Sequence, residues 1–446
     1  MQCNSPNTFH LKELISEEEF LGKIRKKARD FIKLYLFVLD NKENDAIFNG
    51  CVYFNILMLS RSLEDFLDDY EAKNNKTWHH FRELVASIRG FSFILHLYEH
   101  IKKRYLEIEK EEKEEEEVYK VFKEFLNHTE APERFFRNAL LWAFEEIKEE
   151  SIKLKINMPK EKFHDIDFLM DVASNKILPH NIDGIFMNQE TKYITNICSN
   201  FINIGKKFNG LGFDYNNDDI QINETEPYII SEAEIRVFEL QMHNLQSIYD
   251  TFVKDSVEES KDARLPIFRA YISILLHLFE ICRIQIHFYE RHKQINELLR
   301  KAIPDQDIRI YIIKSIHFLG KILEPGSILA SELLGHYSET DSIKLPIPAL
   351  GFHMRPSSLV VSLVKYYGSE VFMKVGNRKF NAGNLLELMW AGGEISRENI
   401  KEVIFEGDKR VLHDLELLAK ANYGEDIIGT DKPLPRELEY LRDRRK

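Results

Sequence analysis

The residues of this chain that could do chemistry are concentrated at positions 351–356, which read Gly-Phe-His-Met-Arg-Pro. A run of apolar residues follows with the three-to-four-residue spacing of one helical face. Its members are Leu359, Val360, Leu363, Val364 and Tyr367. The pattern predicts a helix with Pro356 in its first turn, where the missing N–H costs little. His353 then falls at the N-terminal cap of that helix.

An imidazole at a helix cap lies beside backbone N–H groups without partners and beside the positive end of the helix dipole. A phosphoryl group on His353 would find those N–H groups as donors, and the charge of Arg355 would suit its oxygens. The same field disfavours imidazolium and keeps a ring nitrogen nucleophilic. We therefore predict His353 and Arg355 as catalytic residues of phosphoryl transfer, with Met354, Pro356 and Ser357 as the phosphate-cradling helix N-terminus. Spacing alone leaves open a purely structural capping histidine.

The composition of the chain limits its partners and its compartment. Its 446 residues, 44% of them hydrophobic, carry a formal net charge of −12. Two to four domains are expected for this length, and the charge disfavours nucleic acid and anionic lipid as partners. The four cysteines lie far apart and form no CxxC pair. They indicate neither a zinc ribbon nor a disulfide framework, and they fit a reducing, cytoplasmic location.

No targeting segment and no membrane insertion are expected. The N-terminus lacks the basic and apolar regions of a signal peptide. The most apolar stretch, residues 270–288, carries Glu280 and Arg283. Because charge interrupts it before membrane length, it is expected to be a buried helix.

The remaining chain alternates between two kinds of pattern. Residues 10–150 have helical spacing, and the acidic run 106–125 within them is expected to be an exposed helix or hairpin arm. Residues 151–225 are richer in β-branched residues and Asn, which is typical of short strands with turns. The helical pattern returns at 228–335, and a strand-containing segment follows from 341.

This alternation indicates an internal repeat. Residues 151–175 can be aligned with 342–368, which places His164 opposite His353. The helical halves show a weaker match in nearly the same register. We interpret the chain as two tandem units, and chance similarity between helical segments is the alternative.

Residues 342–425 resemble the histidine-containing phosphocarrier protein (HPr) family of the bacterial sugar phosphotransferase system. The family's active site reads Gly-Leu-His-Ala-Arg-Pro, against Gly-Phe-His-Met-Arg-Pro here, and the likeness continues through the glycine turn and second helix at 376–393 and the last strand and helix at 400–424. The resemblance implies a four-stranded antiparallel sheet with three helices on one face. It also implies that His353 accepts phosphate on Nδ1 from a phosphorylated donor, with Arg355 assisting.

Several positions depart from the family or extend it. Asn384 stands where some members carry a regulatory serine, so serine-kinase control is not expected, although Asn384 can cap a helix. Three apolar residues match the family's partner-docking patch and Trp390 lies beside them, with core packing of an amphipathic helix as the alternative. The predicted docking residues are Leu385, Leu386, Met389 and Trp390. In the first copy Asp165 and Asp167 follow His164 and would repel a phosphate, so this copy is expected to be degenerate.

The expected fold class is α+β multidomain. Each of the two tandem units would consist of an all-helical domain followed by an HPr-like open-faced β-sandwich. The expected domains are 1–150 helical, 151–227 degenerate HPr-like, 228–340 helical, 341–428 HPr-like phosphocarrier and 429–446 a charged C-terminal tail.

The helical domains resemble no family that we recognise. The polar stretch 71–91 allows a binding groove or a helix start after a capped loop. His96 and His100 have a spacing that metal sites use, but core histidines are the default, so no metal and no cofactor are expected. The sequence contains no P-loop, GxSxG or kinase signature, which argues against a phosphoryl donor made by the helical part itself.

The sequence therefore predicts a phosphocarrier-like regulatory protein. His353 would accept a phosphoryl group from a donor resembling enzyme I of the phosphotransferase system, and the helical domains would couple that state to an unknown acceptor or regulated protein. A phosphohistidine adds about two negative charges beside the apolar docking residues and so alters binding. The alternative is a scaffold that is never phosphorylated. An enzyme site in the helical bundle is the weakest of the three interpretations.

Overall fold

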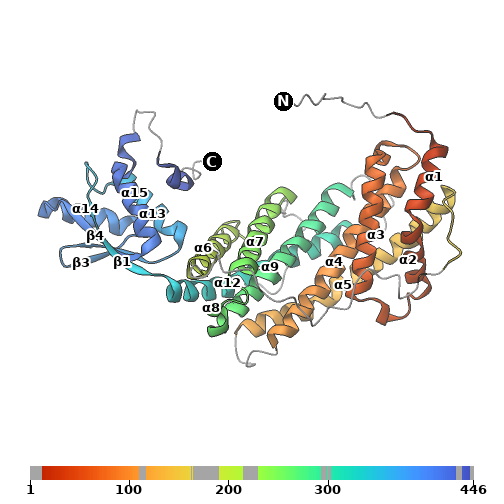
Figure 1. The fold of residues 1–446 in the computed structure, drawn as a ribbon, viewed down its shortest axis with the longest axis horizontal. Coiled ribbons are helices and arrows are strands. Elements are labelled where there is room, and N and C mark those ends of the chain that lie inside the picture. The colour runs from red at the N-terminus through yellow and green to blue at the C-terminus, as the bar shows by residue number, and fades with distance from the viewer. Residues whose placement is uncertain are drawn as a thin grey trace, which may run out of the picture. The chain divides into compact units, whose positions relative to one another are not determined.

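The computed structural model is an α+β protein that is mostly helical and has one small antiparallel sheet of four strands (Figure 1). The expected α+β class is thereby confirmed. The structure describes residues 13–109, 117–161, 163, 190–213, 230–292, 299, 303–427 and 434–441. These residues form two compact units. Unit 1 draws on 1–103, 125–179 and 280–313, and unit 2 on 104–124, 180–279 and 314–446.

Unit 1 is built from helices. The elements that supply it are α1 (Glu17–Lys27), α2 (Arg29–Asp40), η1 (Asp45–Ile47), α3 (Gly50–Asp69), η2 (Ala72–Asn74), most of α4 (His79–Glu109) and of α5 (Glu117–Lys153), and η4 (Phe288–His292). Polar side chains cap the first turns of α1 and α3. Ser16 Oγ accepts the backbone N–H of Glu19, and Asn49 Oδ1 accepts that of Cys51.

The polar stretch 71–91 is the start of a helix after a capped loop, which is one of the two interpretations considered from the sequence. The side chain of Asn75 accepts the backbone N–H of Thr77 at 2.8 Å, and α4 begins one turn later. Arg82, which could have served a binding groove, donates two hydrogen bonds to Asp68 of α3, at 2.8 Å and 2.7 Å. Its charge is therefore already paired inside the unit.

The helices of unit 2 precede and support its sheet. They are α6 (Glu190–Asn209), α7 (Glu232–Phe252), α8 (Val257–Lys261), the first part of α9 (Arg264–His287) and the last part of α12 (Asp305–Tyr337). A capping box begins α7, since Ser231 Oγ accepts the N–H of Glu234 while the Glu234 carboxylate accepts the N–H of Ser231.

Helix α6 lies where short strands were expected, so that prediction is wrong for residues 190–209. The buried apolar residues of α6 recur every three or four positions, which is helical spacing; they include Ile194, Ile197, Phe201, Ile204 and Phe208. None of the residues of 151–227 that the structure describes is in a strand. His164, the site of the expected degenerate copy, lies outside the described residues.

The apolar stretch at 270–288 is the buried helix that its charges predicted. Within the described part of the chain, the helix at Arg264–Arg291 is the one long and apolar enough to cross a membrane, and 67% of its most apolar window is buried inside the protein. The helix therefore packs mainly against other parts of the chain.

The C-terminal domain of unit 2 contains the sheet. Along the chain it consists of β1 (Thr340–Pro346), α13 (Met354–Tyr367), β2 (Val371–Val375), β3 (Arg378–Asn381), α14 (Leu385–Glu398), β4 (Glu402–Asp408) and α15 (Lys409–Lys420). The strands lie in the order β1-β4-β2-β3, and every neighbouring pair is antiparallel. The four-stranded antiparallel sheet with three helices that the sequence predicted is therefore present.

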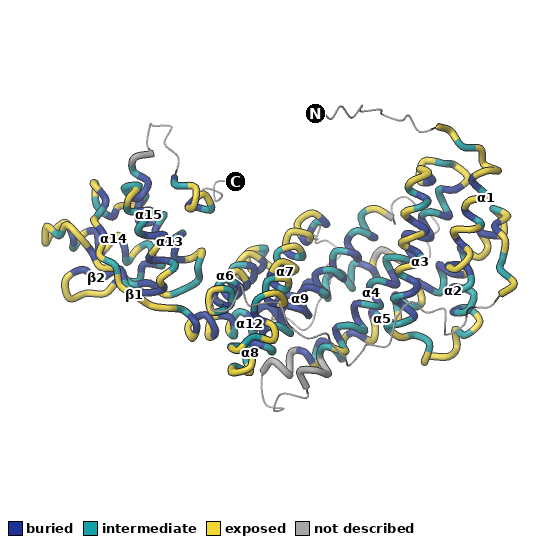
Figure 2. Tube along the Cα trace, viewed as in Figure 1, coloured by how far each residue is buried: buried dark blue, intermediate teal, exposed yellow. Residues whose placement is uncertain are grey.

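One face of this sheet is covered by α13, α14 and α15 (Figure 2). Along β2 buried and half-buried residues alternate, so Val371, Met373 and Val375 point to the helices. The opposite face carries exposed charge, including the ion pair between Lys344 and Glu402. Two left-handed residues end the helices, Gly368 after α13 (φ 70°) and Asn399 after α14 (φ 48°).

The chain does not leave this domain after α15. Turn η5 (Asn422–Ile427) packs against α13, and turn η6 (Arg436–Leu441) follows. Leu434, Leu438 and Leu441 belong to the hydrophobic core of the domain. The described part of the expected charged tail thus packs on the core, because burial of its leucines is favourable.

Candidate functional site

Helix α13 begins as the sequence predicted, with His353 at its N-terminal cap. The cap residue is extended (φ −87°, ψ −172°), and its carbonyl accepts the N–H of Ser357 at 3.1 Å. Its side chain makes no capping hydrogen bond and is 44% exposed. The N–H groups of Met354 and Arg355 find no acceptor among the described backbone groups, since a helix supplies none at its start. The exposed ring therefore lies at a helix end with two free donors.

Arg355 is the cation of this site. It is half-buried and makes no hydrogen bond or ion pair with any residue that the structure describes. A guanidinium presents five donors in a planar fork that suits the oxygens of a phosphoryl group. Arg355 thus offers an unused positive charge two residues after His353.

The structure places the other three residues of the predicted phosphate cradle differently from one another. Met354 is exposed and Pro356 is buried in the first turn, as expected. Ser357, however, is fully buried, its N–H is bonded to His353, and its hydroxyl has no hydrogen-bond partner. The prediction for Ser357 is therefore wrong, because neither its amide nor its hydroxyl faces the surface. At this helix end, the amides of Met354 and Arg355 are the ones without an acceptor among the described backbone groups.

Sequence reasoning missed the residue that contacts His353 most closely. Glu425 in η5 places Oε1 2.6 Å from Nε2 of His353, and its side chain is only 6% exposed. Its other oxygen, Oε2, accepts the N–H of Leu350 at 3.4 Å. The two partners are 72 positions apart, so no local spacing could have indicated the pair.

Three further contacts hold η5 against the loop before α13. Asn422 Oδ1 accepts the N–H of Ala349 at 3.2 Å, and the hydroxyl of Tyr423 donates to the carbonyl of Pro346 at 2.9 Å. The buried ring of Tyr423 lies edge-on to that of Phe352, with 5.2 Å between centroids. Three successive residues, starting with Asn422, have positive φ, at 46°, 50° and 76°. The segment that carries Glu425 is thus tightly bent and firmly held.

The predicted docking residues divide into two groups. Leu386 and Trp390 are 62% and 67% exposed and Met389 is also exposed, whereas Leu385 is half-buried against the core. The alternative of core packing is thus correct for Leu385 alone. Asn384 caps α14 as predicted, since its side chain accepts the N–H groups of Leu386 and of the residue after it, the second and third residues of the helix.

This apolar patch lies close to His353 because α14 approaches the loop before α13. A Cβ built at Gly392 would be 2.6 Å from the carbonyl oxygen of Phe352, whereas nothing lies within 4 Å of one built at Gly393. Only a glycine at position 392 permits this approach. Leu350 and Met354, on either side of His353, are also exposed and extend the apolar surface to the histidine.

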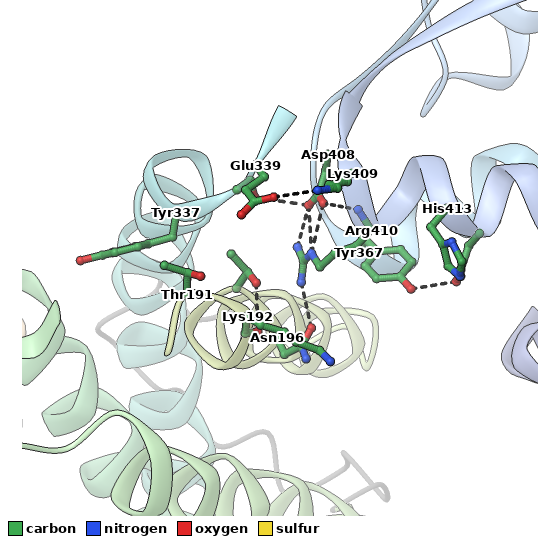
Figure 3. A pocket seen from close by; sticks show the side chains of 13 residues that line it. Thr191, Lys192, Asn196, Tyr337, Glu339, Tyr367, Asp408, Lys409, Arg410 and His413 are labelled. Atoms are coloured by element: carbon green, nitrogen blue, oxygen red, sulfur yellow. Dashed lines mark hydrogen bonds and ion pairs between the residues drawn. The ribbon is translucent and has the colours of Figure 1, made fainter. Parts of the chain in front are cut away.

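A second polar cluster lies at the C-terminal end of α13, around a cavity of about 660 Å³ lined by α6, the C-terminal ends of α12, α13 and β4, and α15 (Figure 3). Arg410 is its centre. The guanidinium donates to both oxygens of Asp408, to Asn196 Oδ1 at 2.9 Å and to Ser199 Oγ at 3.3 Å. It also lies over the ring of Tyr367, 5.3 Å from the centroid.

Asp408 is 2% exposed and has its partners on several elements. Burial alone would raise the pKa of this carboxyl, but hydrogen bonds from Arg410 and Ser369 outweigh burial, so the pKa lies below its ordinary value. Ser338 donates to the same carboxylate at 3.3 Å. The cluster is saturated, and it joins the C-terminal domain to α6 within unit 2.

The paired histidines of the helical part form no metal site in the described residues. No group of three or more His, Cys, Asp or Glu side chains there is placed to hold a metal ion. His96 is half-buried, and its Nδ1 lies 3.2 Å from the carbonyl oxygen of Gly50, which satisfies that ring nitrogen.

Comparisons with known proteins found no similar protein that could assign a role to these residues. No family model matches the chain, and neither a curated protein nor a solved structure matches it significantly. What can be inferred about function therefore depends on the residues and their geometry.

Proposed function

We propose that the C-terminal domain is a phosphoryl carrier in which Nδ1 of His353 accepts a phosphoryl group. One observation carries this proposal: Glu425 occupies Nε2, so that Nδ1 is the ring nitrogen left to react. The next two residues along the chain add backbone amides that have no acceptor among the described backbone groups, and Arg355 adds a guanidinium that pairs with no described residue. Phosphoryl transfer depends mostly on positioning and on stabilisation of charge, and this arrangement supplies both.

The topology of the domain supports the same proposal. An open-faced β-sandwich of the HPr family has four antiparallel strands with three helices on one face, and β1-β4-β2-β3 under α13, α14 and α15 agrees with that description. The tandem arrangement with a second, degenerate copy at 151–227 has less support, since 190–209 is a helix.

The partners follow from the proposed chemistry. The donor would be a protein resembling enzyme I of the phosphotransferase system, acting in the cytoplasm, and the acceptor or regulated protein would bind the exposed apolar patch beside His353. The helical parts would couple the phosphorylated state to that binding. With a net charge of −12, the chain is not expected to bind nucleic acid or to insert into a membrane.

A scaffold that is never phosphorylated is the second candidate. The exposed side chains of Leu386 and Trp390 favour it, because such a patch can bind a partner without any phosphate. Arg355 speaks against it, since a scaffold has no use for a guanidinium that pairs with no described residue.

The direct test is incubation of the full chain with phosphoenolpyruvate and a general enzyme I. We expect phosphate that is labile to acid and stable to base, lost in His353→Ala and retained in His413→Ala, a matched control because His413 is an exposed histidine of the same domain. If no label appears with any cognate donor, the scaffold is the better account.

A small-molecule phosphoryl donor distinguishes an effect on phosphoryl transfer from an effect on the binding of the donor protein. We expect Trp390→Ala to raise the KM for enzyme I about tenfold or more, because exposed aromatic anchors dominate binding energy. Labelling by phosphoramidate, which needs no docking, should be unchanged. An equal loss with both donors would show that Trp390 supports the site rather than the partner.

A further inference from the structure

We infer that Glu425 is the positioning residue that holds the Nε2 proton of His353 and thereby makes Nδ1 the reacting nitrogen and the imidazole a neutral leaving group. The inference deepens the proposed phosphoryl transfer and rests on it. Its basis is the contact of 2.6 Å between a nearly buried carboxylate and one chosen ring nitrogen.

The contact determines where the proton lies. An ionised carboxylate only accepts hydrogen bonds, so the nitrogen that faces it must donate one. A neutral imidazole carries a single N–H, and if that N–H is at Nε2, the lone pair is at Nδ1. The carboxylate itself is held, because its second oxygen accepts the N–H of Leu350 at 3.4 Å.

The backbone of η5 aims the carboxylate at the ring. Asn422 and Tyr423 both adopt the left-handed conformation, which is unfavourable for a residue with a bulky side chain such as tyrosine. Such strain persists only where surrounding contacts over-determine it, and it gathers at functional sites. Here the hydroxyl of Tyr423 is bonded to Pro346 and its ring packs on Phe352. The strained turn is therefore the means by which Glu425 reaches His353.

The transfer step balances without a proton moving across the ring. The lone pair of Nδ1 attacks phosphorus on the phosphorylated donor, the bond from phosphorus to the donor breaks, and its electron pair stays with the donor. The ring becomes an imidazolium whose Nε2–H remains bonded to Glu425. In onward transfer the acceptor's nucleophile attacks phosphorus, the Nδ1–P bond breaks, and the electron pair returns to Nδ1. The leaving group is then neutral imidazole.

Removing the carboxylate would spoil both steps. The ring could place its proton on Nδ1, where it blocks attack on the donor. Once phosphorylated, the ring would lose its Nε2 proton more easily to water, and the leaving group would become an imidazolide anion. We expect transfer to slow about tenfold or more; the loss is smaller than the roughly 10²–10⁴-fold of a general acid or base, because the carboxylate positions a proton and does not transfer one.

The test uses the full chain with ¹⁵N-labelled histidine rings and phosphoramidate as the donor. Wild type is compared with Glu425→Gln, Glu425→Ala and the control Glu416→Gln, whose carboxylate pairs with Lys420 at 2.8 Å on α15. In wild type and control, the neutral ring of His353 should carry its proton on Nε2 and yield Nδ1-phosphohistidine. In both Glu425 variants the other tautomer and Nε2-phosphohistidine should appear.

The outcomes separate this inference from the proposed function. A wild-type ring with its proton on Nδ1 overturns the role of Glu425 without any variant, as does an unchanged product isomer in folded Glu425→Ala. If enzyme I never labels His353 but the phosphoramidate product still depends on Glu425, the role of Glu425 in positioning the ring is supported and the proposed carrier function is wrong.

Discussion

The two ends of helix α13 carry charged clusters of opposite character. At the C-terminal end, Arg410 and Asp408 satisfy each other and also bond with Asn196 and Ser369, so that little hydrogen-bonding capacity is left. At the N-terminal end, Glu425 is nearly buried and bonded, but its partner His353 is half exposed and has one free ring nitrogen. Arg355 beside it pairs with no described residue.

The difference shows which cluster supports the fold and which can react. A buried charge destabilises a protein unless it is paired, and the cluster of Asp408 and Arg410 meets that need completely. Unpaired donors at a surface cost little, because water bonds to them until a ligand arrives. The cluster around His353 is therefore the one that keeps donors available to a ligand, and the cluster around Asp408 holds the domain on α6.

The largest expected effect comes from breaking the saturated cluster. Asp408→Ala leaves Arg410 without its main partner and should lower the free energy of unfolding by about 3 kcal/mol, the lower end for a broken buried pair because Arg410 is partly exposed. Lys409→Ala removes only an exposed ion pair with Glu339 and should change the free energy of unfolding by less than about 0.5 kcal/mol. Urea unfolding measures both. Equal effects of the two variants would contradict the structural role given to Asp408.

A smaller loss of stability is expected where α14 contacts the loop before His353, at Gly392. Gly392→Ala forces α14 away from the carbonyl of Phe352 and should cost about 1–3 kcal/mol of unfolding free energy. Gly393→Ala has open space and should stabilise the helix by up to about 1 kcal/mol. Labelling by phosphoramidate should slow in Gly392→Ala alone. If both variants are stabilised, α14 does not press on the loop of His353.

The smallest effect is the dependence of stability on acid. The pKa of Asp408 is lower in the folded chain than its ordinary value of 3.8, so its contribution is complete above that value and is lost as pH falls through the folded pKa. The difference in unfolding free energy between wild type and Asp408→Asn should be constant at neutral pH and shrink below about pH 4. A difference that instead grows in acid would mean that the carboxyl is not held ionised.

Local patterns predicted the elements of the C-terminal domain well. The start of α13 at Met354 and the place of Pro356 in its first turn follow from the spacing of a few neighbouring residues. Helix α6 was missed, because its isoleucines are typical of strands and its asparagines of turns, although Ile194, Ile197 and Phe201 have helical spacing. Periodicity was the better guide there than composition.

The sequence by itself determined that a histidine would cap a helix with an arginine and a proline in its first turn, since these are contacts within a single turn of chain. Only the tertiary structure decided which ring nitrogen is left to react, that Ser357 is buried behind the site, and that Arg410 joins Asp408 to Asn196 on another helix. Those contacts bridge as many as 214 positions. Side chains so far apart meet only when the whole domain packs, so no local pattern contains them.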